Sequence, residues 1–114
     1  MIKMKYYKLN NCDIEECQES ERKYWRGKNL FRNHIDGYFI STIFLCDDCN
    51  INNIQYGANE PPVLFETMVF DQDGSIMQTK DFLEFERFAT YKDAAEYHNK
   101  RVCDIYNKTR GGTR

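Results

Sequence analysis

The chain has 114 residues, of which 15% are aromatic and 30% are charged, and its formal net charge is -2. This length predicts one domain that is large enough to bury a core. The small net charge excludes a bulk attraction to nucleic acid or to anionic membranes. No apolar run approaches the length of a membrane span, and the first residues lack the apolar stretch of a signal peptide. We therefore expect a cytoplasmic protein with no membrane partner.

The first quarter of the chain predicts a short strand and then a helix. Residues 1–9 form the candidate strand. Asp13 is a suitable helix N-cap with Glu16 as its capping-box partner, and this pair predicts a helix that continues to about Tyr24. Acidic residues at its start and basic residues at its end would complement the helix dipole. Gly27 would end this helix.

The centre of the fold is predicted to be two strands, residues 38–45 and 63–70. Both are rich in aromatic and β-branched residues. The two alternate faces of the first strand are both largely apolar, so this strand is either covered on both faces or central in its sheet. Residues 29–35 form a further strand, and Asp36-Gly37 is a strong hairpin signal between it and the first central strand.

The last third of the chain predicts a returning strand and a long helix. Asp73-Gly74 indicates a second hairpin, and the strand that follows lies within residues 75–89, with an irregularity near Lys80-Asp81. Thr90 is a good N-cap for a helix over residues 91–108. The apolar stripe of this helix consists of Ala94, Ala95, His98, Val102, Ile105 and Tyr106.

These elements predict the α+β class, an antiparallel sheet of four to five strands with a short N-terminal helix and a C-terminal helix packed on the sheet. We expect residues 1–108 to form a single domain. Residues 109–114 are expected to form a flexible basic tail.

Residues 46–62 form a long polar loop, and loops of this length are often functional. Its candidate binding residues are Asp47, Asp48, Tyr56 and Glu60. The three acidic residues could imitate nucleic-acid phosphates and occupy a basic channel of a nuclease.

Residues 22–32 interleave basic and aromatic side chains, which makes Trp25 and Arg26 further binding candidates. This combination suits nucleic acid, through phosphate contacts and base stacking, and also suits an acidic protein surface. The acidic residues just upstream weaken the nucleic-acid interpretation. The structural alternative is a helix end with Trp25 in the core.

Glu66 is a carboxylate within an apolar strand. It either forms an ion pair with an arginine or acts as a buried acid in a pocket. His98 lies on the apolar stripe of the last helix, which favours a hydrogen-bonded core imidazole over a ligand or base. His34 is expected at the surface. A small enzyme that uses Glu66 with His98 or Arg87 is one alternative function, and a buried structural network of Glu66, Arg87 and His98 is the other interpretation.

The five cysteines include a CxxC pair, Cys46 and Cys49, and a second pair, Cys12 and Cys17. These four thiols could hold zinc if the fold brought them together. An odd number of cysteines fits reduced thiols better than a closed disulfide framework. We expect no cofactor and no metal, with zinc as the alternative.

Three stretches, together with the acidic loop, carry a family resemblance: YFISTIFL, PPVLFETMVF and FERFATYKDAAEYH. They resemble a family of small uncharacterised proteins encoded by bacteriophages, and Phe-Glu-Thr-Met-Val-Phe is the most specific part. The resemblance covers about the last two thirds of the chain. Cys46 and Cys49 do not belong to the family pattern, and the loop is longer here. The matching positions are Ser41, Thr42, Asp48, Pro61, Pro62, Phe65, Glu66, Thr67, Met68, Val69, Phe70, Arg87, Phe88, Thr90, Ala94 and His98.

The resemblance implies a phage or prophage origin but carries no established activity. Small phage accessory proteins are often inhibitors of host defence. We therefore expect a binding protein that inhibits a bacterial defence system, such as an anti-CRISPR that blocks a nuclease complex, in the cytoplasm of the bacterial host. One alternative is sequestration of a small nucleotide immune signal, which predicts a pocket at an oligomer interface, with a homodimer as one such oligomer.

Overall fold

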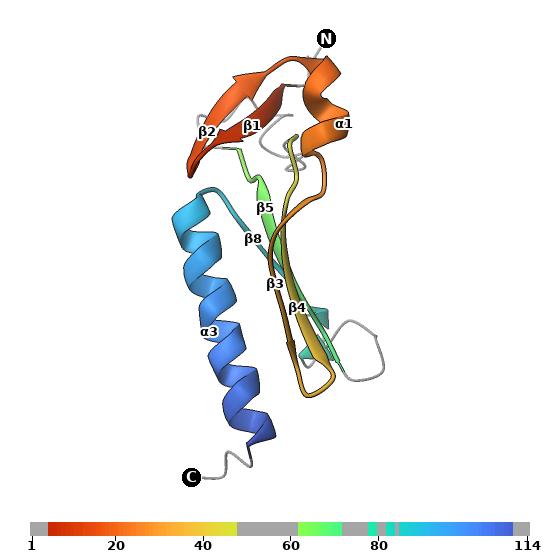
Figure 1. Cartoon of the computed structure of the whole chain (residues 1–114), viewed down its shortest axis with the longest axis vertical. Helices are drawn as coiled ribbons and strands as arrows, with labels where there is room; N and C mark the ends of the chain where they lie inside the picture. Colours follow the sequence, from red (N-terminus) through yellow and green to blue (C-terminus); the bar gives the residue numbers. More distant parts are fainter. Residues whose placement is uncertain (1–4, 48–61, 72–77, 80–81, 84, 111–114) are drawn as a thin grey trace.

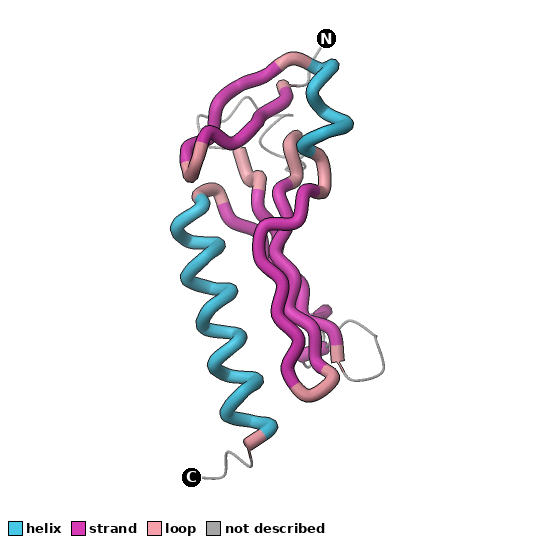
Figure 2. Tube along the Cα trace, viewed as in Figure 1, coloured by secondary structure: helices cyan, strands magenta, loops and turns pink. Residues whose placement is uncertain are grey.

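The computed structural model describes residues 5–47, 62–71, 78–79, 82–83 and 85–110. It confirms the α+β class (Figure 1). A four-stranded antiparallel sheet has the strand order β3-β4-β5-β8, and the long helix α3 packs on one face of it. A two-stranded hairpin, β1–β2, and the short helix α1 lie together at one end of the molecule (Figure 2).

The predicted helix that begins at Asp13 is wrong. Strand β1 (Tyr6–Asn10) pairs with β2 (Asp13–Cys17), and the turn between them places Asn11 at a φ of 58°. The signals at Asp13 and Glu16 are local, whereas pairing with β1 lets Ile14 pack against the core. Tertiary packing therefore overrides the capping signals here.

Helical structure begins later, at the 3₁₀ turn η1 (Glu19–Glu21), and continues as α1 (Arg22–Trp25). Gln18 and Glu21 form the capping box that the sequence had placed at Asp13 and Glu16. Gly27 follows α1 with a φ of 75°, which confirms its predicted role as the helix terminator.

Strands β3 (Lys28–Ile35) and β4 (Tyr38–Phe44) form the predicted hairpin. Asp36 and Gly37 have φ values of 49° and 90°, as a two-residue turn with two positive φ angles requires. Strand β4 also pairs with β5 (Phe65–Phe70), so it is central in the sheet.

The predicted returning strand is divided into β6 (Gln78–Thr79), β7 (Phe82–Leu83) and β8 (Phe85–Phe88). Strands β6 and β7 pair with each other, and β8 alone pairs with β5. The irregularity that the sequence predicts near Lys80-Asp81 lies outside the described residues. The predicted hairpin at Asp73-Gly74 lies outside the described residues.

Helix α3 (Tyr91–Thr109) begins as predicted, because the Thr90 hydroxyl accepts a hydrogen bond from the Asp93 N–H at 3.1 Å. Ala94, His98 and Ile105 are buried against the sheet, whereas Tyr106 is 49% exposed and is not part of the core. Among the described residues, no helix is long and apolar enough to cross a membrane.

Candidate functional site

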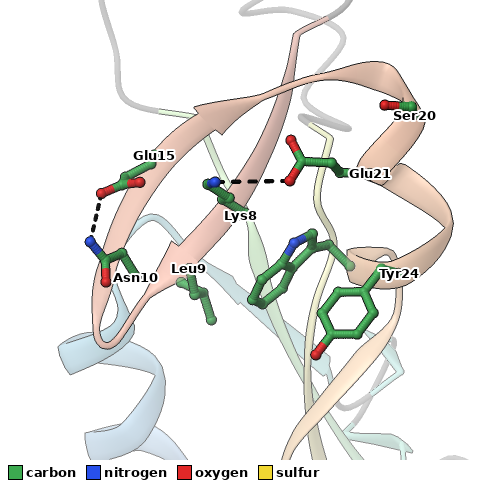
Figure 3. Close-up of a pocket in the computed structure, with 8 residues that line it drawn as sticks. Lys8, Leu9, Asn10, Glu15, Ser20, Glu21 and Tyr24 are labelled. Carbon is green, nitrogen blue, oxygen red and sulfur yellow. Dashed lines mark hydrogen bonds and ion pairs between the residues drawn. The ribbon is translucent and has the colours of Figure 1, made fainter.

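A pocket with a volume of about 740 Å³ lies between the β1–β2 hairpin and α1 (Figure 3). This volume is within the range of small-ligand sites. The pocket includes Trp25, one of the binding residues that the sequence predicts. Its lining residues are Lys8, Leu9, Asn10, Glu15, Ser20, Glu21, Tyr24 and Trp25.

Trp25 is half-buried, because its indole ring contacts one core residue and one exposed residue. It packs edge-on against Phe44 in the core, with 6.0 Å between ring centroids, and edge-on against Tyr24 at 5.0 Å. Tyr24 is 62% exposed. The Lys28 ammonium lies 4.2 Å from the centroid of the Tyr24 ring, in a cation–π contact. Trp25 is thus both a core residue and a wall of the pocket.

The polar walls of the pocket carry both signs of charge. Lys8 Nζ lies 3.8 Å from a carboxylate oxygen of Glu21, and the Asn10 amide donates a hydrogen bond to Glu15 at 2.8 Å (Figure 3). Glu21 also accepts a hydrogen bond from the Gln18 N–H. Two carboxylates against one ammonium make this pocket unfavourable for a phosphate group.

Asp47 and Arg26, which the sequence predicts as separate binding residues, are brought together. One carboxylate oxygen of Asp47 lies 2.9 Å from Arg26 Nη1 and 3.2 Å from Arg22 Nε. The Asp47 side chain is only 6% exposed, and its backbone bridges to Tyr6 of β1. These contacts join α1 to the end of β4. The other loop candidates, Asp48, Tyr56 and Glu60, lie outside the described residues.

Glu66 forms the ion pair that the structural interpretation predicts. It faces Arg87 across strands β5 and β8, and Arg87 Nε donates to its carboxylate at 2.8 Å. Glu66 is 7% exposed as a residue, so the carboxylate is largely removed from water and has a charged partner.

His98 is the centre of a buried hydrogen-bond network. Its Nδ1 lies 2.8 Å from the Thr42 hydroxyl, which in turn lies 2.6 Å from the Thr67 hydroxyl. Its Nε2 lies 2.8 Å from Asn33 Oδ1. Because a carbonyl oxygen accepts only, Nε2 carries the proton and Nδ1 accepts from Thr42. Burial lowers the pKa of His98 below its usual value of 6.5, which favours this neutral form.

Glu66 and His98 do not meet. Thr67 follows Glu66 on β5 and faces α3, so Glu66 faces the opposite side of the sheet. The structure therefore does not form the Glu66–His98 arrangement that one enzyme alternative requires.

The structure brings two of the four zinc candidates together. Cys17 and Cys46 lie close enough to influence each other: burial is the main cause that raises the pKa of Cys17, and the neighbouring Cys46 raises it further. Cys12 is exposed in the turn of the hairpin, and Cys49 lies outside the described residues. Within the described part of the chain, no group of three or more potential metal ligands occurs.

A row of stacked rings crosses strands β3, β4 and β5, and we call it the aromatic row: His34, Phe39 and Phe70. The His34 and Phe39 rings are 4.6 Å apart and nearly parallel at 3°, and the Phe39 and Phe70 rings are 5.5 Å apart at 22°. Arg32 lies over Phe39, with 4.9 Å from Cζ to the ring centroid. His34 is exposed, as the sequence predicts.

The sequence did not indicate Phe39 or Phe70, the other two members of the aromatic row, as site residues. The signal was present in the alternation of β4, which places Phe39 on the face opposite to Ile40. Alignment with His34 and Phe70 depends on the register of three strands, which the alternation alone does not determine.

Comparisons of this chain with protein-family models, with curated proteins and with solved structures found no match.

Proposed function

We propose that the chain is a phage or prophage accessory protein that acts by binding a host protein. In this proposal it inhibits a bacterial defence system in the host cytoplasm, in the manner of an anti-CRISPR that blocks a nuclease complex. The resemblance of its sequence to phage-encoded proteins supports the origin. The pocket between the β1–β2 hairpin and α1 supports the binding of a protein.

The observation that carries this proposal is the exposed ring of Tyr24 beside the half-buried ring of Trp25. Trp and Tyr are frequent anchors of protein interfaces, because they bury a large area and still offer a polar atom. The surrounding charges of Lys8, Glu15 and Glu21 would form the polar rim of such an interface. Their net negative charge favours a protein partner over nucleic acid.

Inhibition of a nuclease by charge imitation is a finer part of the proposal. Asp47 is unsuited to this role, because Arg22 and Arg26 already neutralise it and it is almost fully buried. The remaining candidates for imitation of nucleic-acid phosphates are Asp48 and Glu60.

The two alternatives make different demands on the chain. An enzyme would have to use Glu66 with Arg87, since His98 faces the other side of the sheet. Sequestration of a nucleotide in the pocket at Tyr24 would place its phosphate against acidic walls, which disfavour it.

The test is a pull-down from bacterial lysate with the wild-type protein, followed by reconstitution of the complex from purified components. Tyr24→Ala should abolish or greatly weaken the complex. Tyr106→Ala is the matched control, because Tyr106 is the other large apolar side chain with high exposure among the described residues, and it lies on α3. Nuclease activity of the captured complex should fall when the wild-type protein is added.

Two results would contradict the proposal. One is a partner that binds Tyr24→Ala and wild-type protein equally well, which would remove the pocket as the interface. The other is a released small nucleotide with no protein partner, which would favour sequestration.

A further inference from the structure

Arg32 differs from the other arginines that the structure describes, because no acidic side chain in the described part of the chain pairs with it. Each of the others pairs with a carboxylate: Arg22 and Arg26 with Asp47, Arg87 with Glu66, Arg101 with Asp104 and Arg110 with Asp36. Arg32 is exposed on β3, and within the described residues its contact is the cation–π interaction with Phe39. Its N–H donors remain available for a ligand that brings its own negative charge.

The aromatic row lies directly beside this guanidinium group. Its outer end is the exposed ring of His34 on β3, and β3 is an edge strand because it pairs with β4 alone among the described strands. No described ring stacks on the outer face of His34. One further flat ring could therefore extend the row at the edge of the sheet.

We propose that the aromatic row and Arg32 form a binding site for single-stranded nucleic acid. An unpaired base stacks on His34, and Arg32 donates hydrogen bonds to the adjoining phosphate. Every base has a face suited to stacking on an aromatic side chain, and the guanidinium fork matches phosphate oxygens. The proposal is independent of the pocket at Tyr24, because it uses other residues on other elements.

The charge on this face of the sheet fits an anionic ligand. Among the described residues of this face, the buried carboxylate of Glu66 is neutralised by Arg87, and no carboxylate pairs with Arg32. Arg32 and His34 are two residues apart on one strand, about 7 Å at the usual rise, which is within the reach of a single nucleotide.

The open edge of the sheet favours single-stranded nucleic acid over a free nucleotide or a duplex. A free nucleotide normally binds in a cavity that covers most of its surface, and neither Arg32 nor His34 lines the pocket at Tyr24 or the pocket at the start of α3. In a duplex the bases are already stacked and paired, so they would have to be separated before one could reach His34.

The test is fluorescence anisotropy of the full chain with a labelled single-stranded oligonucleotide of about ten nucleotides, a length within the usual site sizes. His34→Ala should weaken binding about tenfold or more, and His34→Tyr should restore it, because the ring and not the imidazole nitrogen makes the contact. Arg32→Gln should weaken binding and reduce the slope of log affinity against log salt by about 1.

Matched controls separate this site from the rest of the molecule. Lys92→Gln removes an exposed cation from α3, which covers the opposite face of the sheet, and should bind nearly like the wild type. Tyr24→Ala should also bind the oligonucleotide normally, so the failure of the pocket proposal and the failure of this one remain distinguishable. Both site residues are exposed, so each variant should keep the circular dichroism spectrum of the wild type.

Three outcomes would overturn the proposal. The first is no binding of the oligonucleotide at low salt. The second is normal binding by both His34→Ala and Arg32→Gln. The third is equal affinity for a duplex or a free nucleoside monophosphate, which would exclude an unpaired strand as the preferred ligand.

Discussion

The hydroxyl oxygens of Thr42 and Thr67 lie 2.6 Å apart in the interface between the sheet and α3, and neither residue is exposed to solvent. Thr42 also bonds to His98, whose other ring nitrogen reaches Asn33. One chain of hydrogen bonds therefore connects β3, β4 and β5 with the helix. Such a network stabilises only when every member has a partner, so its members are sensitive to single substitutions.

Thr42→Val should destabilise the protein by about 1–3 kcal/mol, because it leaves His98 Nδ1 buried without a donor while the side-chain shape is nearly unchanged. Thr67→Val should cost less, since His98 keeps its bond to Thr42. Urea unfolding followed by circular dichroism measures both values. Equal costs for the two variants would contradict the order of bonds from Thr67 through Thr42 to His98.

The stability of the protein should depend on pH through His98. Burial lowers its pKa in the folded chain below the unfolded value of about 6.5. Below pH 6.5 the unfolded chain therefore binds a proton that the folded chain does not, and the free energy of unfolding falls as the pH drops toward the folded-state pKa. Above pH 6.5 this group contributes no slope.

The measurement is urea unfolding at several pH values between about 5 and 8, the range in which histidine titrates. The variant His98→Gln should lose the part of the slope due to His98, and His34→Gln should retain it. If wild-type protein and His98→Gln showed the same pH profile, the buried imidazole could not be the source of the pH dependence.

Local sequence signals predicted the elements whose geometry is decided locally. The Asp36-Gly37 turn determined the β3–β4 hairpin, and Thr90 with Asp93 determined the start of α3. Asp13 and Glu16 gave an equally good local signal for a helix, but β1 was available as a partner and the segment became a strand. Pattern reasoning fails at such positions because it does not include the competing long-range pairing.

The sites depend on contacts between residues that are distant in sequence. Asp47 meets Arg22 across 25 positions, and His98 meets Thr42 across 56. The residue types indicated that Glu66 and His98 needed partners, and the structure supplies a different partner for each. The partners follow from strand register and from the placement of α3, which the sequence alone did not define.

Asp47→Asn should destabilise the protein by about 1–2 kcal/mol, because it removes the charge that holds Arg22 and Arg26. The cost is moderate since both arginines are partly exposed, at 43% and 51% of their side chains. Arg26→Gln should cost less than Asp47→Asn, because Arg22 keeps its partner. Thermal unfolding at low and high salt is the measurement, and a difference that does not shrink with salt would argue against an electrostatic origin.

Gly27→Ala should cost about 1 kcal/mol, entirely through the backbone. Gly27 has a φ of 75°, and an added Cβ would meet nothing within 4 Å. Gly27→Asn is the control, because asparagine tolerates the left-handed region better than alanine does. An alanine variant as stable as the wild type would show that α1 can end in another conformation.

The Glu66–Arg87 pair should show a coupling energy of about 1–2 kcal/mol in a double-mutant cycle of Glu66→Gln and Arg87→Gln. The Glu66 side chain is 9% exposed and the Arg87 side chain 41%, so the pair is partly shielded from screening by salt. In the structural interpretation, Glu66→Gln alone is destabilising, because Arg87 then loses the negatively charged group that accepts its hydrogen bond. That group is largely shielded from water. If Glu66 instead served catalysis at a cost in stability, removing its buried negative charge in Glu66→Gln should stabilise the protein. A gain in stability in Glu66→Gln, together with negligible coupling to Arg87, would therefore return the enzyme alternative to consideration.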